Sequence, residues 1–266
     1  MLSPFLRTDI APFVALAQAE EWICGRWEFE FLLQQFPQGC LVLRVEGVAV
    51  GYITSVRHGN SGWIGNLLVR EEARRRGVGR LLMEGALAAL LADGVETVWL
   101  TASAKGAGLY EKLGFAPIDS INRWVGEGRG HSVTAPARAD LEAVRKVDRA
   151  GWGDRRTDLL ETACARGVLH GGVDSFLCCQ PWKEGTQLGP WGALAAAQAE
   201  ALLDTALAGL SGTAFLDVPA RNVSAAALLT RRGFAIKGTN ILMFLGVVPQ
   251  YEPERIYALA SMGSMG

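Results

Sequence analysis

The spacing of hydrophobic residues changes along the chain and predicts an alternation of helices and strands. Residues 2–8 predict a short strand, and apolar residues at helical spacing behind Asp9 predict a first helix. A second short helix is expected over residues 28–36, where Pro37 ends it. Three β-rich runs then alternate with turn residues, which is typical of an antiparallel meander: residues 40–47, 48–59 and 61–69.

Helical spacing returns after the meander. Apolar residues recur in this way over residues 78–91, and the turn at Asp93 and Gly94 closes the helix. Further elements are expected in this order: a strand at residues 97–101, a helix at 107–113 and strands within 115–125. The first half is therefore predicted to be α+β, with a mostly antiparallel mixed sheet flanked by helices.

The same order of motifs returns in the second half of the chain. Residues 109–116, LYEKLGFA, return as residues 228–235, LLTRRGFA, and the helix at residues 79–90 matches residues 200–210. Because the order is kept, these matches indicate a tandem duplication of one fold. The predicted organisation is a first domain at residues 1–126, a glycine-rich linker at 127–136 and a second domain at 137–266 with a short C-terminal helix.

Charge and composition exclude several classes of partner. The net charge of -1 and the pI near 6.3 give no overall attraction to nucleic acid or to an anionic membrane, so we expect a small-molecule or peptide partner. No apolar run approaches the roughly 20 residues that span a bilayer, and no signal peptide precedes the first strand. A cytoplasmic protein is therefore expected. The five cysteines form no CxxC pair, so neither a disulfide framework nor a metal is expected.

Candidate chemistry lies between the third strand of the meander and the helix that follows it. Residues 67–83 combine a buried strand, an arginine-rich turn, two glycines and a long helix. Gly77 and Gly79 let the backbone approach a ligand closely, and the helix N-terminus and the arginines attract anions. A pyrophosphate suits this turn. The plainer alternative is an ordinary strand-to-helix turn with a solvated run of arginines.

The motif Arg74-x-x-Gly77-x-Gly79 resembles the pyrophosphate-binding signature of the GNAT superfamily of N-acetyltransferases. The resemblance implies acetyl-CoA as co-substrate, with its pantetheine arm held by the backbone of three residues: Leu67, Leu68 and Val69. It also implies that the phosphates are wrapped by the turn and the start of the helix: Arg74, Arg75, Arg76, Gly77, Val78, Gly79 and Arg80.

A second signature of the family is matched by residues 108–115, GLYEKLGF, which resemble its helix and following strand. By this resemblance Tyr110 is the general acid that protonates the departing CoA thiolate. The plainer alternative is that Tyr110 merely packs, as aromatic residues on short amphipathic helices usually do. Ser103 falls near an asparagine of the family that contacts the CoA arm, and its hydroxyl can donate one hydrogen bond there.

The acceptor side carries fewer signals. Trp63 stands where some family members have a glutamate base, so a base must come from elsewhere. Glu21 and Trp22 are our candidates for the acceptor pocket, because the family commonly shapes this pocket with the same segment. A solvated surface glutamate and a packed tryptophan are the plainer alternatives. Glu20, Glu21 and Glu28 together would make the mouth acidic, which favours small amines.

The second copy lacks the residues that carry chemistry in the first. Alignment of the two long helices puts three other residues opposite the arginine and the glycines of the motif: Ala195, Gln198 and Glu200. Leu229 stands opposite Tyr110, and a carboxylate at Glu200 would repel a phosphate. We therefore expect a degenerate second GNAT-like domain. The whole chain resembles bacterial two-domain acetyltransferases of unassigned substrate.

These observations predict an acetyl-CoA-dependent N-acetyltransferase in which the amine of a small molecule or of a peptide attacks the thioester directly. Two alternatives stay open: a non-catalytic module that binds acetyl-CoA, and an acyltransferase that uses a longer acyl-CoA. The chain is expected to be a monomer or a homodimer, because the duplication can replace a GNAT dimer internally while edge strands can still pair between chains.

Overall fold

The computed structural model describes residues 1–130, 140–183 and 185–266 and divides the chain into two compact units. Unit 1 consists of three segments: Met1–Leu100, Leu245–Val247 and Gly263–Met265. Unit 2 consists of the others: Thr101–Phe244, Val248–Met262 and Gly266. The expected linker lies outside the described residues from position 131 onward.

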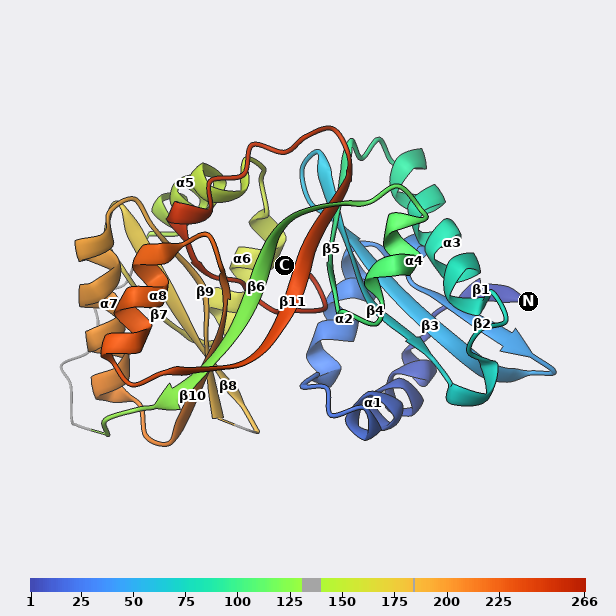
Figure 1. The fold of residues 1–266 in the computed structure, drawn as a ribbon, viewed down its shortest axis with the longest axis horizontal. Helices are drawn as coiled ribbons and strands as arrows, with labels where there is room; N and C mark the ends of the chain where they lie inside the picture. Colours follow the sequence, from blue (N-terminus) through green and yellow to red (C-terminus); the bar gives the residue numbers. More distant parts are fainter. Residues whose placement is uncertain (131–139, 184) are drawn as a thin grey trace. The chain divides into compact units, whose positions relative to one another are not determined.

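Unit 1 is built on a sheet with the predicted meander at its centre (Figure 1). Its strands follow one another in chain order: β1 (Leu2–Pro4), β2 (Leu41–Val45), β3 (Val48–Arg57), β4 (Ser61–Val69) and β5 (Thr97–Ala102). Neighbours are antiparallel from β1 to β4, whereas β4 and β5 are parallel. Its helices and 3-10 turns are η1 (Arg7–Asp9), α1 (Ile10–Ala19), α2 (Arg26–Gln35), η2 (Pro37–Gly39), η3 (Glu71–Ala73) and α3 (Val78–Ala92).

Successive residues of β3 point to opposite faces of this sheet and meet different helices. The ring of Tyr52 lies 5.5 Å from that of Phe13 in α1, and the Phe13 ring lies 4.7 Å from that of Phe29 in α2. Gly51 faces α3, where an added Cβ would come within 2.8 Å of Val78 Cγ1. Helices therefore cover both faces, and Gly51 lets α3 lie close to the sheet.

Unit 2 repeats this architecture with the strand order β11-β6-β10-β9-β8-β7, and β12 pairs with β9. Its strands are β6 (Ala116–Glu127), β7 (Val168–Gly171), β8 (Ser175–Trp182), β9 (Gly185–Ala193), β10 (Thr213–Pro219), β11 (Ala235–Gly246) and β12 (Ile256–Ala258). Its helices and 3-10 turn are α4 (Ala107–Glu111), α5 (Leu141–Trp152), α6 (Thr157–Arg166), α7 (Ala196–Gly209), α8 (Val223–Arg231) and η4 (Pro253–Arg255).

Two pairs of helices cover the faces of the unit 2 sheet. Leu177 of β8 belongs to the apolar core that holds Leu203 of α7 and Leu229 of α8. Its neighbour Phe176 packs instead with Val144 of α5 and with α6. Because adjacent strand residues face opposite sides, α7 and α8 cover one face and α5 and α6 the other. Figure 1 shows α7 and α8 in front of the strands of this unit.

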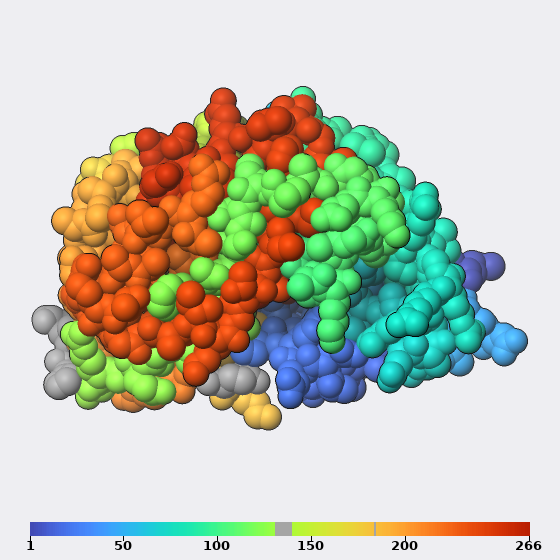
Figure 2. All heavy atoms as spheres, in the orientation of Figure 1, coloured from blue at the N-terminus to red at the C-terminus, as the bar shows by residue number. Residues whose placement is uncertain are grey.

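Each unit is completed by strands from the other half of the sequence. β6, from the first half, lies in unit 2 between β10 and β11 and is antiparallel to both. Figure 2 shows β6 and β11 side by side on one face of the molecule. Arg123 of β6 donates to both carboxylate oxygens of buried Asp217 in β10, at 2.8 and 2.6 Å. Conversely, Val247 lies in unit 1, where its carbonyl accepts a hydrogen bond from Thr97 Oγ1 at 2.7 Å.

The predicted α+β class and the mostly antiparallel mixed sheet flanked by helices are confirmed. The predicted domain boundaries at residues 126 and 137 stay a prediction, since contacts group β6 with unit 2. The expected short C-terminal helix is absent from the described residues; the 3-10 turn η4 and strand β12 stand there instead. The run from Ile256 to Ala260 is buried, which favours an extended strand between other strands.

Three further features bear on the expected class of protein. No helix among the described residues is long and apolar enough to cross a membrane. In the same residues, no group of three or more His, Cys, Asp or Glu side chains could hold a metal. Cys40 and Cys179 are buried, and burial raises the pKa of each thiol to about 12, so both thiols stay protonated at neutral pH.

Candidate active site

Strand β4 leaves its neighbour β5 partway along its length. The two strands pair in parallel from Ser61 to Trp63, whereas β4 continues to Val69. Asn66 has φ of 55°, and the pairing of β4 with β3 shifts register beside it, which marks a β-bulge. Asparagine tolerates this left-handed conformation, and its Nδ2 donates to Thr54 Oγ1 at 2.9 Å. Beyond Trp63, no ladder among the described residues pairs β4 with β5. Gly263 and Ser264 lie against β4 at Gly65, and the contact of residues 67–69 with the pantetheine arm stays a prediction.

The predicted pyrophosphate turn leads from this strand into α3. Gly77 is the N-cap of α3 and adopts the left-handed conformation with φ of 80°, which favours glycine. An added Cβ at Gly77 would meet nothing within 4 Å, so the turn is open there. No side chain caps the helix, and its first N–H groups, at Val78, Gly79 and Arg80, carry the partial positive charge of the helix end. The geometry suits an anion.

The arginines of the turn divide into two groups. Arg74 donates from Nε to the Val69 carbonyl at 3.0 Å and from Nη2 to the Glu20 carboxylate at 2.5 Å. Arg75 and Arg76 are exposed and form no ion pair within the part of the chain that the structure describes. Their charges are therefore available to a phosphate without breaking another contact. Arg80 pairs with Glu84 one turn further along α3, at 2.7 Å.

Tyr110 lies in unit 2, in the last turn of α4, and is partly buried. Its ring packs edge-on against Phe115, with 6.1 Å between ring centres. Gly106 lies behind the ring, where an added Cβ would stand 3.4 Å from Tyr110 Cε2. Burial raises the pKa of the phenol to about 12, so it is a neutral hydrogen-bond donor at physiological pH. No hydrogen bond occupies its oxygen among the described residues.

Ser103 begins the turn between β5 and α4. Its side-chain oxygen accepts a hydrogen bond from Gly106 N–H at 3.2 Å, and its carbonyl accepts from Gly106 and Ala107. The side chain is exposed. The hydroxyl therefore caps the turn before α4, while its own proton stays available for donation. The predicted contact of Ser103 with the CoA arm stays a prediction.

The candidates for the acceptor side lie at the end of α1 in unit 1. Glu21 has φ of 60°, and the Trp22 side chain is half exposed beside it. Glu20 is engaged by Arg74, which was not expected from sequence. Trp63 is buried in β4, as the predicted loss of the family's glutamate there requires. The role of Glu21 and Trp22 in acceptor binding stays a prediction.

The equivalent turn of unit 2 is shortened. Strand β9 ends at Ala193 and α7 begins at Ala196, so two residues replace the turn that residues 70–77 form in unit 1. The N-cap is Ala195, with φ of -141°, and no side chain caps the helix. Leu229, opposite Tyr110 in the alignment, is fully buried in the apolar core. The connection between β9 and α7 is therefore shorter than the turn of unit 1, and the predicted loss of CoA binding in this copy stays a prediction.

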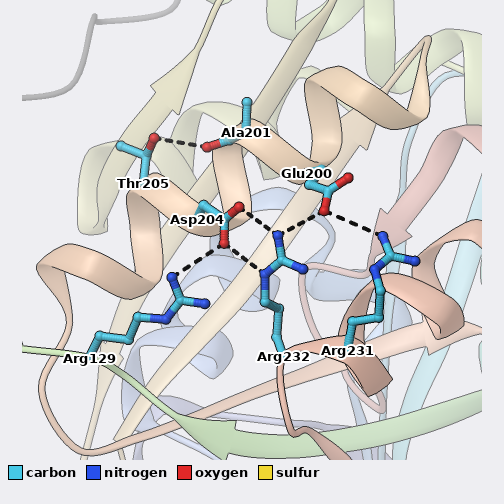
Figure 3. Close-up of polar contacts among 7 residues, drawn as sticks. All are labelled: Arg129, Glu200, Ala201, Asp204, Thr205, Arg231 and Arg232. Carbon is cyan, nitrogen blue, oxygen red and sulfur yellow. Dashed lines mark hydrogen bonds and ion pairs between the residues drawn. The ribbon is translucent and has the colours of Figure 1, made fainter.

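An ion-pair network stands on α7 instead of an open anion site (Figure 3). Arg232, which follows α8, donates from Nε and Nη2 to Asp204 at 2.8 and 2.7 Å. The same Nη2 donates to Glu200 at 2.8 Å, and Arg231 and Arg129 approach the two carboxylates from either side. Hydrogen bonds from Arg232 lower the pKa of both carboxyl groups. These arginines are bound by carboxylates of the same unit.

The gap between the parallel strands of unit 2 is filled by its own chain. β9 and β10 pair over two residues, Thr186–Gln187 with Ala214–Phe215. β12 then pairs with β9 at Trp191 and Gly192, and Leu259 N–H donates to the Asp217 carbonyl of β10 at 2.9 Å. β9 is the counterpart of β4 in unit 1. Unlike the end of β4, the end of β9 is hydrogen-bonded to another strand of its own unit, β12.

Two features of unit 1 were not found from sequence. The bulge at Asn66 has a weak signal, a polar residue inside an apolar strand. The contact of residues 263–265 with unit 1 has none, because these residues are separated by some two hundred positions from those they touch. Sequence analysis also gave Glu28 as one of several surface carboxylates, whereas its side chain is buried.

Comparison with known families agrees with this geometry. The model of the Acetyltransferase (GNAT) family matches residues 9–115, and that of an Acetyltransferase (GNAT) domain matches residues 144–258. An uncharacterized N-acetyltransferase of Methanocaldococcus jannaschii is 28% identical over 115 residues, which are 38% of this chain. The match spans about half, 49%, of that relative's length.

Solved structures share the fold over the whole chain. A putative acetyltransferase from Pyrococcus horikoshii superposes with a TM-score of 0.87 at 23% identity, covering 100% of this chain and 95% of the other. A GCN5-related N-acetyltransferase from Sphaerobacter thermophilus gives a TM-score of 0.64 at 16% identity, covering 95% and 97%. These likenesses concern the fold, and the two family matches extend over both halves of the sequence. The chain therefore belongs to the GNAT family of acetyltransferases and carries two GNAT domains in tandem.

Proposed function

We propose that this protein is an acetyl-CoA-dependent N-acetyltransferase that acetylates the amine of a small molecule. The observation that carries the proposal is the turn of unit 1, where left-handed Gly77 precedes the uncapped N-terminus of α3. This turn follows directly on the part of β4 that has left β5. Membership of the GNAT family supports acetyl transfer, and the open turn and the unpaired strand support CoA as the carrier.

In the proposed complex, unit 1 binds the CoA moiety. The N–H groups of Val78, Gly79 and Arg80 and the side chains of Arg75 and Arg76 bind the diphosphate. The backbone of residues 67–69 binds the amides of the pantetheine arm. Arg74 joins them when its exposed ion pair with Glu20 opens, which costs little because such pairs contribute about 0–1 kcal/mol.

Acetyl transfer is proposed to proceed by direct attack. The neutral amine attacks the thioester carbonyl and forms the new C–N bond, the nitrogen releases a proton to solvent water, and the C–S bond breaks. The sulfur leaves as a thiolate that needs a proton. Tyr110 is the proposed donor, because burial raises the pKa of its phenol to about 12 and keeps it protonated at neutral pH. Ser103 is proposed to donate a hydrogen bond from its hydroxyl to the CoA arm.

The test measures release of free thiol from acetyl-CoA with a panel of primary amines. We expect Tyr110→Phe to lower kcat about a hundredfold and to leave the affinity for acetyl-CoA unchanged, as for loss of a general acid. The matched control is Tyr257→Phe, which removes a hydroxyl from a buried tyrosine of β12 and should keep kcat within about twofold.

Two results would count against the proposal. If acetyl-CoA binds and no amine is acetylated, a non-catalytic acetyl-CoA-binding module becomes the better account. If turnover occurs but Tyr110→Phe behaves like the wild type, acetyl transfer stands and the acid must be sought elsewhere. Substitution of longer acyl-CoA donors in the same assay decides the acyl-chain preference.

A further inference from the structure

Glu28 is a buried carboxylate in the first turn of α2. Its side chain is 1% exposed, and Oε2 accepts a hydrogen bond from the Gly25 N–H at 2.7 Å. This contact is half of a capping box, which stabilises the start of a helix. A capping glutamate needs one oxygen for this purpose and is normally at the surface. The second oxygen of Glu28 and the burial of the whole side chain therefore need another reason.

The other oxygen is bound by a residue from the far end of the chain. Ser264 Oγ donates to Glu28 Oε1 at 2.7 Å, and both groups are buried within unit 1. The segment Gly263–Met265 that carries this serine lies against β4. An added Cβ at Gly65 would stand 2.1 Å from the Gly263 carbonyl oxygen and 2.9 Å from Ser264 Cα.

This contact lies at the point where β4 is no longer paired with β5. β4 parts from β5 after Trp63, and the bulge falls at Asn66, next to Gly65. Thr54 Oγ1 donates to the Gly65 carbonyl at 3.3 Å, so further buried polar groups gather at the same turn of the strand. Ser264 therefore contacts both Glu28 and, at Gly65, the part of β4 that is not paired with β5.

We propose that Glu28 binds an ammonium group of the acceptor, and that the Ser264 hydroxyl holds this place until the acceptor displaces it. The inference rests on the function proposed above. A hydroxyl and an ammonium both form charge-assisted hydrogen bonds with a carboxylate, but only the ammonium adds the attraction between two full charges, so an amine competes with Ser264. A carboxylate oxygen also accepts more than one hydrogen bond, so Glu28 keeps its contact with Gly25 during the exchange.

The chemistry of acetyl transfer narrows the acceptor class. The nitrogen that attacks the thioester must be neutral, whereas a nitrogen held by Glu28 as an ammonium is protonated. One molecule satisfies both conditions when it carries two amines, one for each role. The acceptor is therefore a small diamine or polyamine, of which one nitrogen is anchored and the other is acetylated.

The test compares 1,4-diaminobutane with butylamine, which has the same carbon chain and one amine fewer. Initial rates of thiol release give kcat and KM for both amines with wild-type protein, Glu28→Gln, Ser264→Ala and Glu30→Gln. Glu30 lies on the same helix, is partly exposed and pairs with Arg26, which makes it the matched control.

We expect opposite effects from the two partners of the hydrogen bond. Glu28→Gln should raise KM for the diamine about thirtyfold with kcat nearly unchanged, and leave butylamine within about twofold. Ser264→Ala removes the competing hydroxyl and should lower KM for the diamine about threefold. Glu30→Gln should change neither amine. If the hydrogen bond between Glu28 and Ser264 were only structural, Glu28→Gln and Ser264→Ala would both raise KM for the diamine.

The outcomes separate the two proposals. Thiol release with both amines but no preference for the diamine overturns the inference and leaves the proposed function intact. No thiol release with any amine in the wild type overturns the proposed function and the inference with it. If thermal melting shows that Glu28→Gln is unfolded, Ser264→Ala decides: a lower KM for the diamine supports the inference, and an equal or higher KM overturns it.

Discussion

The turn after β4 in unit 1 and the turn after β9 in unit 2 begin from equivalent strands and lead into equivalent helices. Unit 1 places residues 70–77 between strand and helix, with left-handed Gly77 and with Arg75 and Arg76, which form no ion pair among the described residues. Unit 2 connects the same elements through Leu194 and Ala195. The anion site that we propose in unit 1 thus depends on a turn that unit 2 lacks, although both units keep the strand and the helix on either side of it.

The gap between the parallel strands shows the same contrast. In unit 1 the ladder between β4 and β5 ends at Trp63, and beyond it the segment Gly263–Met265 lies against β4 at Gly65 without forming a strand. In unit 2 the corresponding gap is filled by β12, which binds β9 on one side and reaches β10 on the other. The end of β4 in unit 1, which we propose binds the ligand, is not paired with β5, whereas unit 2 uses the corresponding opening to complete its core.

The largest expected effect concerns the structural role of unit 2. Asp217 is fully buried and receives two hydrogen bonds from Arg123, which ties β6 of the first half to β10 of the second. Asp217→Ala leaves the arginine without its buried partner and should lower the free energy of unfolding by about 3 kcal/mol. Urea unfolding measures this loss, and titration with acetyl-CoA should show unchanged affinity.

The control for this variant is an exposed ion pair. Asp93 pairs with Arg57 at the surface, so Asp93→Ala should change the free energy of unfolding by less than about 1 kcal/mol. An Asp217→Ala protein that folds stably and has lost acetyl-CoA affinity would contradict the assignment of binding to unit 1.

A second, smaller effect concerns the turn itself. Gly77→Ala places a Cβ on a left-handed residue, which costs about 1–2 kcal/mol, and this strain should weaken acetyl-CoA binding about tenfold. Gly94 ends the same helix with φ of 79° and has equal space around it. Gly94→Ala should therefore lose similar stability without losing affinity. Equal affinity losses in both variants would show that strain, and not the position of Gly77, governs binding.

The smallest effect concerns the ion-pair network on α7. Arg232→Gln should lower the melting temperature by about 2 °C or less at pH 7, because the partner carboxylates are more than a third exposed. The network lowers the pKa of Asp204 in the folded state, so its contribution is present above the ordinary carboxyl pKa and is lost as pH falls through the lowered value.

The melting temperatures of the wild type and Arg232→Gln should therefore converge between about pH 5 and pH 3, as the carboxyl groups take up protons. A difference that persists at pH 3 would show that Arg232 stabilises unit 2 by packing and not by charge. Neither result should alter acetyl-CoA affinity.

Local patterns in the sequence were sufficient for much of this picture. Gly77 was predicted to stand where the backbone turns sharply, and it has the left-handed conformation. The turn at Asp93 and Gly94 was predicted to close the long helix, and α3 ends at Ala92 with left-handed Gly94 two residues later. The loss of the turn in the second copy was also readable, since Ala195 supplies neither a charge nor a left-handed conformation.

Long-range pairings could not be predicted in this way. β6 has the alternation of an ordinary strand, and nothing in its residues shows that β10 and β11 of the other half are its neighbours. The same holds for Ser264, whose contact with Glu28 joins distant parts of the chain. Such contacts depend on the packed structure as a whole. A hydrophobic pattern predicts that a residue is buried, but it does not identify the residue that it contacts.

The measurement that tests this account most directly is calorimetric titration of the intact protein with acetyl-CoA, repeated on Gly77→Ala. The account predicts one molecule bound per chain, with affinity reduced about tenfold in the variant. Two molecules bound per chain, or one molecule whose affinity does not depend on Gly77, would contradict the conclusion that unit 1 holds the acyl-CoA site and that unit 2 has filled its own.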